Sequence, residues 1–306
     1  MLWRTHFHSS VLCNVSGSGK TLALLSGLHG HWGFYLTAAD GPDAVGSKDL
    51  AWVIRNMPNQ SSWIGDVFRN TADNRDIRTR SQKNEVTASK EMAKVLFARY
   101  AIFQLFIEEV RTKYDRLPEH TKADWTLYQI APALRGDEDV FLSFIRNCLT
   151  GVDEKLLNML GWPSPWGILG EDLSNEQFYF VLDEVQVAGD AHMGCFSDAE
   201  GKRRRPVLRP FVERLTVEGT HPIIVSGTGI SLEDIKTVLG SGVGKSFEWR
   251  VHHEMDDLSE RSRQEEYIRR YLPEEFLETK SGQLFLNRMW ELFRGRSVSR
   301  MSRSTC

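Results

Sequence analysis

The sequence predicts an α/β fold, a parallel β-sheet with helices on both faces, on the strength of three observations. Residues 11–28 have the pattern of a strand, a glycine-rich turn and a helix. Two later apolar runs, at residues 178–182 and 222–225, lack alternation, as strands buried on both faces do. Elsewhere apolar residues recur every three or four positions, which indicates helices that cover the sheet.

The first element ends in Gly17-Ser18-Gly19-Lys20-Thr21, which is typical of a phosphate-binding loop (P-loop, or Walker A motif). Backbone N–H groups of such a turn converge at the start of the next helix, where the helix dipole favours anions. We expect Lys20 to reach the β- and γ-phosphates of a nucleotide and the Thr21 hydroxyl to ligate Mg²⁺. The residues expected to bind the nucleotide are Asn14, Ser16, Gly17, Ser18, Gly19, Lys20, Thr21 and Leu22.

Asn14 departs from the usual pattern G-x-x-x-x-G-K-[ST], which begins with glycine. Asparagine adopts left-handed backbone conformations more readily than most residues with a Cβ, so the turn can survive the change. The alternative is a chance glycine-rich turn between a strand and a helix, without a ligand.

After the loop helix, residues 33–40 are predicted to form a second strand. Residues 41–85 are predicted to be a partly irregular connection with one short helix at 50–54. Helical periodicity predicts a helix from Val86 to about Lys113, whose Phe and Tyr side chains suit core packing better than a binding platform. Further helices are predicted around residues 127–134, at 140–148 and at 156–160.

Asp183 and Glu184 follow directly after the apolar run 178–182. Ligands of parallel sheets bind at the carboxyl ends of the strands, so Asp183 is expected to hold Mg²⁺ and Glu184 to polarise the attacking water. A protein that only holds a nucleotide needs the metal ligand but not the base, so the second acid favours hydrolysis. Two solvated acids at a strand end are the alternative.

Residues 222–229 are predicted to form a third buried strand that ends in small hydroxyl residues. Ser226 and Thr228 are candidates to hydrogen-bond the γ-phosphate or the attacking water. Alternatively, this strand end caps a next helix through the S-x-x-D box of Ser231 and Asp234.

Residues 186–205 are predicted to be a solvated loop, with His192 as a surface histidine. The loop includes the basic run Lys202–Arg205, which lacks the interleaved aromatic residues of a nucleic-acid site. A helix is predicted to start at Pro206.

Helices at 259–272 and 284–293 are expected to form a lid over the nucleotide. The predicted organisation is an NTPase core at 1–85 and 161–250, a helical insertion at 86–160, a helical lid at 251–296 and a disordered basic tail at 297–306.

Composition sets the remaining expectations. A formal net charge of −3 and an estimated pI of 6.3 give no global electrostatic reason to expect nucleic acid or an anionic membrane as partner. The four cysteines have no C-x-x-C spacing, so neither a zinc site nor a disulfide framework is indicated. No signal peptide or membrane span is recognised, and an intracellular protein of cytoplasm or nucleus is expected.

The chain resembles the P-loop ATPase module of Crinkler-type proteins of basidiomycete fungi and oomycetes, which are related to the retrotransposon hot spot proteins of trypanosomes. The resemblance spans residues 1–296 and rests on the run 11–28 and on His31-Trp32-Gly33-Phe34-Tyr35, Gly46-Ser47-Lys48-Asp49-Leu50, Leu182-Asp183-Glu184, Ser226-Gly227-Thr228-Gly229 and Arg294-Gly295-Arg296.

The resemblance implies an AAA-like or STAND-like NTPase with a three-layer fold, using ATP and Mg²⁺ and often fused to a nuclease domain. By position, Lys20, Thr21, Asp183 and Glu184 take the roles given above. Arg294 and Arg296 could stabilise charge from the lid, or could lie on a solvated lid surface. The chain departs from the family at Asn14, in lacking a nuclease-like segment after 296 and in its tail, which suggests a fragment or a truncated gene model.

The expected function is Mg²⁺-dependent hydrolysis of ATP that drives a switch or remodelling step on a macromolecular partner, protein or nucleic acid, with a possible homo-oligomer. The alternative is a module that holds the nucleotide without turnover, and a phosphotransferase is a third option. A GTPase is disfavoured because the one match to N/T-K-x-D, at residues 121–124, falls in a helical region.

Overall fold

The computed structural model describes residues 9–13, 19–42, 44–69, 71, 73–132, 138–153, 155–157, 165–170, 176–217, 221–228, 249–252, 261–269 and 272–293. Within them the core is a five-stranded sheet of parallel strands in the order β2-β3-β6-β1-β7. The predicted α/β class with a parallel sheet is confirmed. The strands are β1 (Ser9–Cys13), β2 (Trp32–Thr37), β3 (Phe178–Asp183), β6 (Ile223–Gly227) and β7 (Trp249–His252).

The three strands β2, β3 and β6 are buried along their whole length, which explains their continuous apolar sequences. Alternate side chains point to opposite faces of the sheet. Tyr35 and Val181 pack with Leu24 and Leu28 of helix α1 (Lys20–Gly30) on one face. Phe34, Phe180 and Val225, whose side chains alternate with these along the strands, belong to the large core on the opposite face. The sheet is therefore the middle of three layers.

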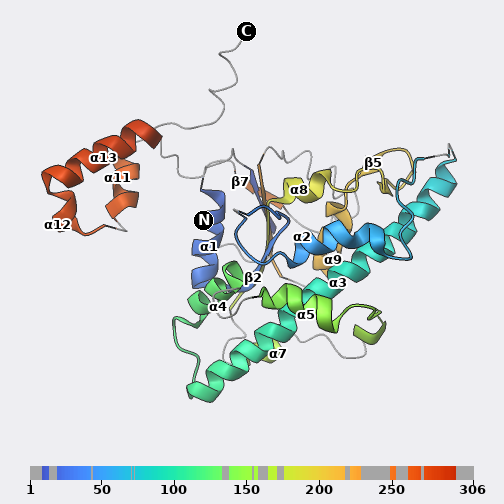
Figure 1. Ribbon diagram of the computed structural model, residues 1–306, viewed down its shortest axis with the longest axis horizontal. Helices are drawn as coiled ribbons and strands as arrows, with labels where there is room; N and C mark the ends of the chain where they lie inside the picture. Colours follow the sequence, from blue (N-terminus) through green and yellow to red (C-terminus); the bar gives the residue numbers. More distant parts are fainter. Residues whose placement is uncertain are drawn as a thin grey trace, which may run out of the picture.

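The opposite face is covered chiefly by the long helix α3, with α2, α5 and α9 around it (Figure 1). Phe34 lies edge-on to Tyr100 of α3, with ring centroids 4.8 Å apart, and Phe103 packs against the same ring. The prediction that the aromatic stripe packs in the core is confirmed. These helices are α2 (Asp49–Asn56), α3 (Asn74–Lys113), α5 (Val140–Cys148) and α9 (Leu208–Val217).

Helix α3 begins at Asn74, twelve residues before the predicted start at Val86. Asp73 caps it by accepting a hydrogen bond from the backbone N–H of Arg75 at 2.9 Å. The prediction of an irregular connection up to residue 85 was therefore wrong over this part. The first three turns of α3 are mostly exposed and carry few apolar residues, so hydrophobic periodicity does not indicate a helix there.

Helix α4 (Thr121–Ile130) lies along the outer edge of β2 and partners that edge strand's free backbone groups. Trp125 Nε1 donates to Gly33 O at 2.9 Å, and the Gln129 side chain bonds both Gly33 O and Tyr35 N. A sheet edge covered in this way cannot pair with another strand. The helices predicted as an insertion thus contribute to the layers around the sheet.

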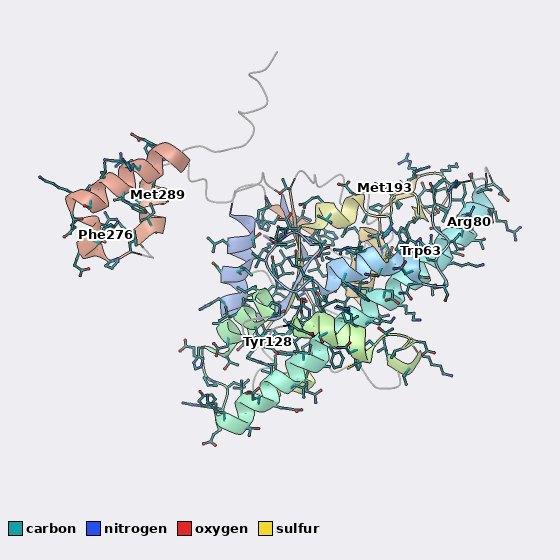
Figure 2. The ribbon with its side chains drawn as sticks, viewed as in Figure 1. Trp63, Arg80, Tyr128, Met193, Phe276 and Met289 are labelled. Atoms are coloured by element: carbon teal, nitrogen blue, oxygen red, sulfur yellow. The ribbon has the colours of Figure 1, made fainter. Side chains whose placement is uncertain are left out.

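Residues 186–205 are not the loop that was predicted. They include helix α8 (Val185–Asp190) and an antiparallel pair of two-residue strands, β4 (Phe196–Ser197) and β5 (Arg204–Arg205). Such short elements carry no periodicity that a sequence pattern could show. His192 is partly buried, with Nε2 2.7 Å from Ile54 O and its ring edge-on to Trp63, which Figure 2 labels.

The C-terminal helices α11 (Arg261–Arg269), α12 (Glu274–Leu277) and α13 (Lys280–Phe293) pack on one another. Their small core consists of Ile268, Leu277 and Leu286, with Met289 against it, and Figures 1 and 2 draw the group apart from the sheet. Helices here were predicted. Their closure over the sheet edge stays a prediction. The roles of Arg294 and Arg296 also stay predictions, because both residues lie outside the described residues. The tail 297–306 and the predicted cap residues Ser231 and Asp234 lie outside them as well.

The remaining elements are the 3₁₀-helix η1 (Met57–Asn59) and α7 (Pro165–Leu169). No helix in the described part of the chain has the length and apolarity needed to span a membrane.

Candidate functional site

The first turn of α1 forms one side of the site. Gly19 precedes the helix with φ 81°, a left-handed conformation that glycine adopts without the steric cost of a Cβ. Lys20 opens the helix and is only 5% exposed, whereas Leu22 is 40% exposed. The predicted loop residues Asn14, Ser16, Gly17 and Ser18 lie outside the described residues.

Asp183 forms the centre of the site at the carboxyl end of β3, where it is 1% exposed. Its Oδ2 accepts hydrogen bonds from Thr21 Oγ1 at 2.9 Å and from the Tyr35 hydroxyl at 2.8 Å. Its Oδ1 accepts one from the backbone N–H of Glu184 at 2.9 Å. Three donors offset the cost of burying this carboxylate. The two residues predicted to hold Mg²⁺ therefore lie in direct contact, although 162 positions separate them in the sequence.

Tyr35 was not among the predicted site residues. Burial, followed by the nearby Asp183 charge, raises the pKa of Tyr35 above its ordinary value, so its hydroxyl keeps its proton and donates. The apolar run of β2 shows no alternation from which the face of Tyr35 could be predicted. The pairing of β2 with β3, which brings it to Asp183, is a tertiary feature that no local pattern contains.

Ser226 lies on β6, the strand between β1 and β3. Leu182 pairs with Val225, so Ser226 is in step with Asp183, and alternation directs both side chains to the α1 face. Ser226 is 0% exposed, and its Oγ has no hydrogen-bond partner among the described residues. A buried hydroxyl without a partner costs free energy, so this atom has unused capacity for a ligand.

Glu184 has a left-handed backbone conformation, with φ 54° and ψ 37°, at the N-terminus of α8. For a residue with a Cβ this conformation is strained, and such strain concentrates at functional sites. The Glu184 carboxylate accepts a hydrogen bond from Gln186 Nε2. Gln186 Oε1 in turn accepts one from the backbone N–H of Thr228 at 3.1 Å.

Gln186 therefore joins Glu184 to the residue just after β6, and it was also missed in the sequence. Its role depends on the left-handed turn at Glu184, which residue types alone do not specify. Thr228, predicted beside Ser226, lies beyond the strand and takes part through its backbone N–H.

The described residues hold no cluster of three or more His, Cys, Asp or Glu side chains that could bind a metal ion. Thr21 and Asp183 suit a cation that takes its remaining ligands from phosphate and water, as Mg²⁺ commonly does.

Cys148 is exposed and Cys195 is buried, and both are free thiols. Burial raises the pKa of the Cys195 thiol to about 11.

The basic run 202–205 lies away from this site, on β5 and the turn before it. Arg204 is 3.7 Å from Asp66 in an ion pair, and its guanidinium lies over the Phe68 ring at 5.3 Å. The Asp198 side chain accepts a hydrogen bond from the backbone N–H of Lys202 at 2.7 Å. Burial alone would raise the pKa of Asp198, but hydrogen bonds from the backbone of Lys202 and Arg203 and the nearby arginine charges lower it below its ordinary value. The run is thus partly paired with acids of its own surroundings.

Three segments meet at the carboxyl edge of the sheet: the first turn of α1, the pair Asp183 and Glu184 after β3, and Ser226 on β6. Each comes from a different part of the chain, and the parallel strand order brings them together. Comparison of the chain with protein-family models, with curated proteins and with solved structures finds no significant match.

Proposed function

We propose that this chain binds ATP with Mg²⁺ at the carboxyl edge of its sheet and hydrolyses it. The observation that carries the proposal is the 2.9 Å hydrogen bond from Thr21 Oγ1 to Asp183 Oδ2. It joins the hydroxyl after the loop lysine to the carboxylate at the end of a buried strand. In P-loop enzymes these two kinds of group hold the Mg²⁺ that accompanies the nucleotide.

A second support is the hydroxyl of Ser226, which is unpaired with respect to the residues that the structure describes. It is buried on the strand between β1 and β3, on the face from which α1 starts. A polar atom aimed into an apolar layer without a partner fits a bound oxyanion or water better than it fits a packing role. A strand end that only caps a following helix would not need this buried hydroxyl.

The residues divide the chemistry among them. Lys20 and the N–H groups at the start of α1 bind and orient the phosphates. Thr21 and Asp183 hold Mg²⁺, which supplies neutralisation of charge on the β- and γ-phosphates. Glu184 accepts a proton from the attacking water, and Ser226 donates a hydrogen bond to the γ-phosphate or to that water.

The resemblance to Crinkler-type modules favours ATP over other nucleotides. We further propose that turnover moves the C-terminal helices and so acts on a macromolecular partner. Asn14, in place of the usual glycine, favours a second reading in which the nucleotide is held without turnover.

Steady-state phosphate release from ATP and Mg²⁺, together with binding of a fluorescent ATP analogue, tests the proposal. We expect wild type to bind and turn over, Glu184→Gln to bind without turnover, and Lys20→Ala to bind at least about tenfold more weakly. Lys202→Ala and Glu200→Gln, both at exposed positions, are matched controls that should behave as wild type.

Lys20-dependent binding without release above that of Glu184→Gln would replace hydrolysis by nucleotide holding. Absence of any Lys20-dependent binding would overturn both readings, and Asn14→Gly would then show whether the loop alone is at fault.

A further inference from the structure

We infer that Tyr35 is a positioning residue for the cation site, holding the Asp183 carboxylate in the orientation that a divalent metal requires. The inference rests on the proposed function, because it concerns the same site. Asp183 Oδ2 is a shared acceptor: it accepts hydrogen bonds from the Tyr35 hydroxyl at 2.8 Å and from Thr21 Oγ1 at 2.9 Å.

Tyr35 is itself held from two directions. Its backbone N–H donates to Gln129 Oε1 at 2.9 Å, and Gln129 Nε2 also donates to Gly33 O at 3.1 Å on the same strand. Its ring lies against Gly46, where an added Cβ would come within 2.9 Å of Tyr35 Cε1. The φ of +100° at Gly46 also disfavours any side chain. The Tyr35 hydroxyl therefore has a defined position before any ligand arrives.

The hydrogen bond from Tyr35 is compatible with a bound cation. Thr21 can direct an oxygen lone pair at a cation while its hydroxyl continues to donate its hydrogen bond to Asp183 Oδ2. The Tyr35 hydroxyl approaches from β2, a different element from α1, so the two donors do not exclude each other. Donors behind a metal-binding carboxylate fix its orientation, and their loss typically weakens metal affinity about 10–100-fold.

A purely structural role for Tyr35 is the competing explanation, and Tyr35→Phe separates the two. This change removes one oxygen and keeps the ring that packs in the core. Tyr179→Phe is the matched control: Tyr179 lies in the same cluster, but its hydroxyl donates to Gln177 Oε1 at 2.7 Å, away from Asp183.

The readout is binding of Mn²⁺, followed by the electron paramagnetic resonance signal of the free ion, with a non-hydrolysable ATP analogue present. We expect the apparent Kd for Mn²⁺ to rise about tenfold in Tyr35→Phe and to stay within about twofold of wild type in Tyr179→Phe. Binding of a fluorescent analogue in EDTA should be unchanged in both, because the Tyr35 hydroxyl donates to Asp183, which is proposed to hold the metal and not the phosphates. With Asp183→Asn already present, Tyr35→Phe should cause no further change in the Kd for Mn²⁺.

Two results overturn the inference while leaving the proposed function intact. One is an unchanged Kd for Mn²⁺ in Tyr35→Phe; the other is an equal rise in Tyr179→Phe, which would indicate general loosening of the cluster. Failure of wild type itself to bind the analogue in a Lys20-dependent way would remove the proposed function, and this inference with it.

Discussion

Arg99 of α3 and Asp49 of α2 form a doubly hydrogen-bonded ion pair in which both side chains are 0% exposed. Nε lies 2.7 Å from Oδ2 and Nη2 lies 2.8 Å from Oδ1. The guanidinium also lies over the Phe141 ring of α5, 4.0 Å from its centroid. One charged group thus ties together three helices on the large-core face of the sheet.

Breaking this pair from one side should be costly. Arg99→Met leaves a buried carboxylate without its partner, and we expect the free energy of unfolding to fall by about 3–5 kcal/mol. Adding Asp49→Leu should recover much of the loss, because no charge then stays buried. Urea unfolding of the two single variants and the double variant measures this. Glu108→Ala, at an exposed position of the same helix, should change the value by less than about 0.5 kcal/mol. Additive losses would show that the two charges are not coupled.

Ser226→Ala should separate stability from activity. In the absence of ligand the change removes a buried hydroxyl that has no partner in the described part of the chain, so the free energy of unfolding should stay equal or rise by about 1 kcal/mol. Phosphate release should fall roughly 100-fold, because one preorganised donor is lost.

Ser81→Ala is the matched control for that experiment. Ser81 is also buried, but its Oγ accepts from Ser197 N at 2.9 Å and donates to Glu85 Oε1 at 3.1 Å. It should therefore lose about 1–3 kcal/mol of stability and keep its turnover. A destabilised Ser226→Ala that retains full turnover would contradict a ligand-binding role for this hydroxyl.

Gln186→Leu should lower turnover without lowering nucleotide affinity. The change removes the amide that holds the Glu184 carboxylate and that accepts from Thr228 N. A base that is less well oriented costs rate, and we expect phosphate release to fall roughly tenfold with the Kd of a fluorescent ATP analogue within about twofold of wild type. Gln177→Leu, at the opposite end of β3, should have neither effect. Wild-type turnover in Gln186→Leu would leave Gln186 a purely structural residue.

Acid should weaken the fold partly through His221. Its ring packs edge-on against Phe178 and Phe180, and burial lowers its pKa from 6.5 to about 4. Between these values the unfolded chain binds more protons than the folded chain, so stability is full above about pH 6.5 and is lost as the pH falls toward 4. From pH 7.5 to 5 the loss from this group is about 2 kcal/mol.

Urea unfolding at pH 7.5 and 5.0 measures this loss, and His221→Phe should reduce it. Some dependence should remain, because burial lowers the pKa of His31 in the same direction. A dependence on pH that His221→Phe does not reduce would show that other groups cause it.

The residues that carry the proposed chemistry were predictable where they follow buried strands. Asp183 and Ser226 stand at the ends of apolar runs, and such runs mark strands whose carboxyl ends share one edge of a parallel sheet. Helix α5 was predicted with its observed bounds, because Asp139 caps it and its apolar residues repeat clearly. The start of α3 was missed because its first turns are exposed and show no such repeat.

The sequence by itself thus determined the α/β class, four of the five described strands of the sheet, most of the helices, and the residue types at the strand ends. The strand β7 was not predicted, and it reaches into the range that was assigned to the helical lid. Only the tertiary structure decided which of these residues meet. The strand order places β6 between β1 and β3, and pairing of β2 with β3 brings Tyr35 to Asp183. The turn at Glu184 likewise brings Gln186 to Thr228. The physical reason is that periodicity and capping act within a few residues, whereas hydrogen bonds between distant segments depend on which strands and helices pack side by side.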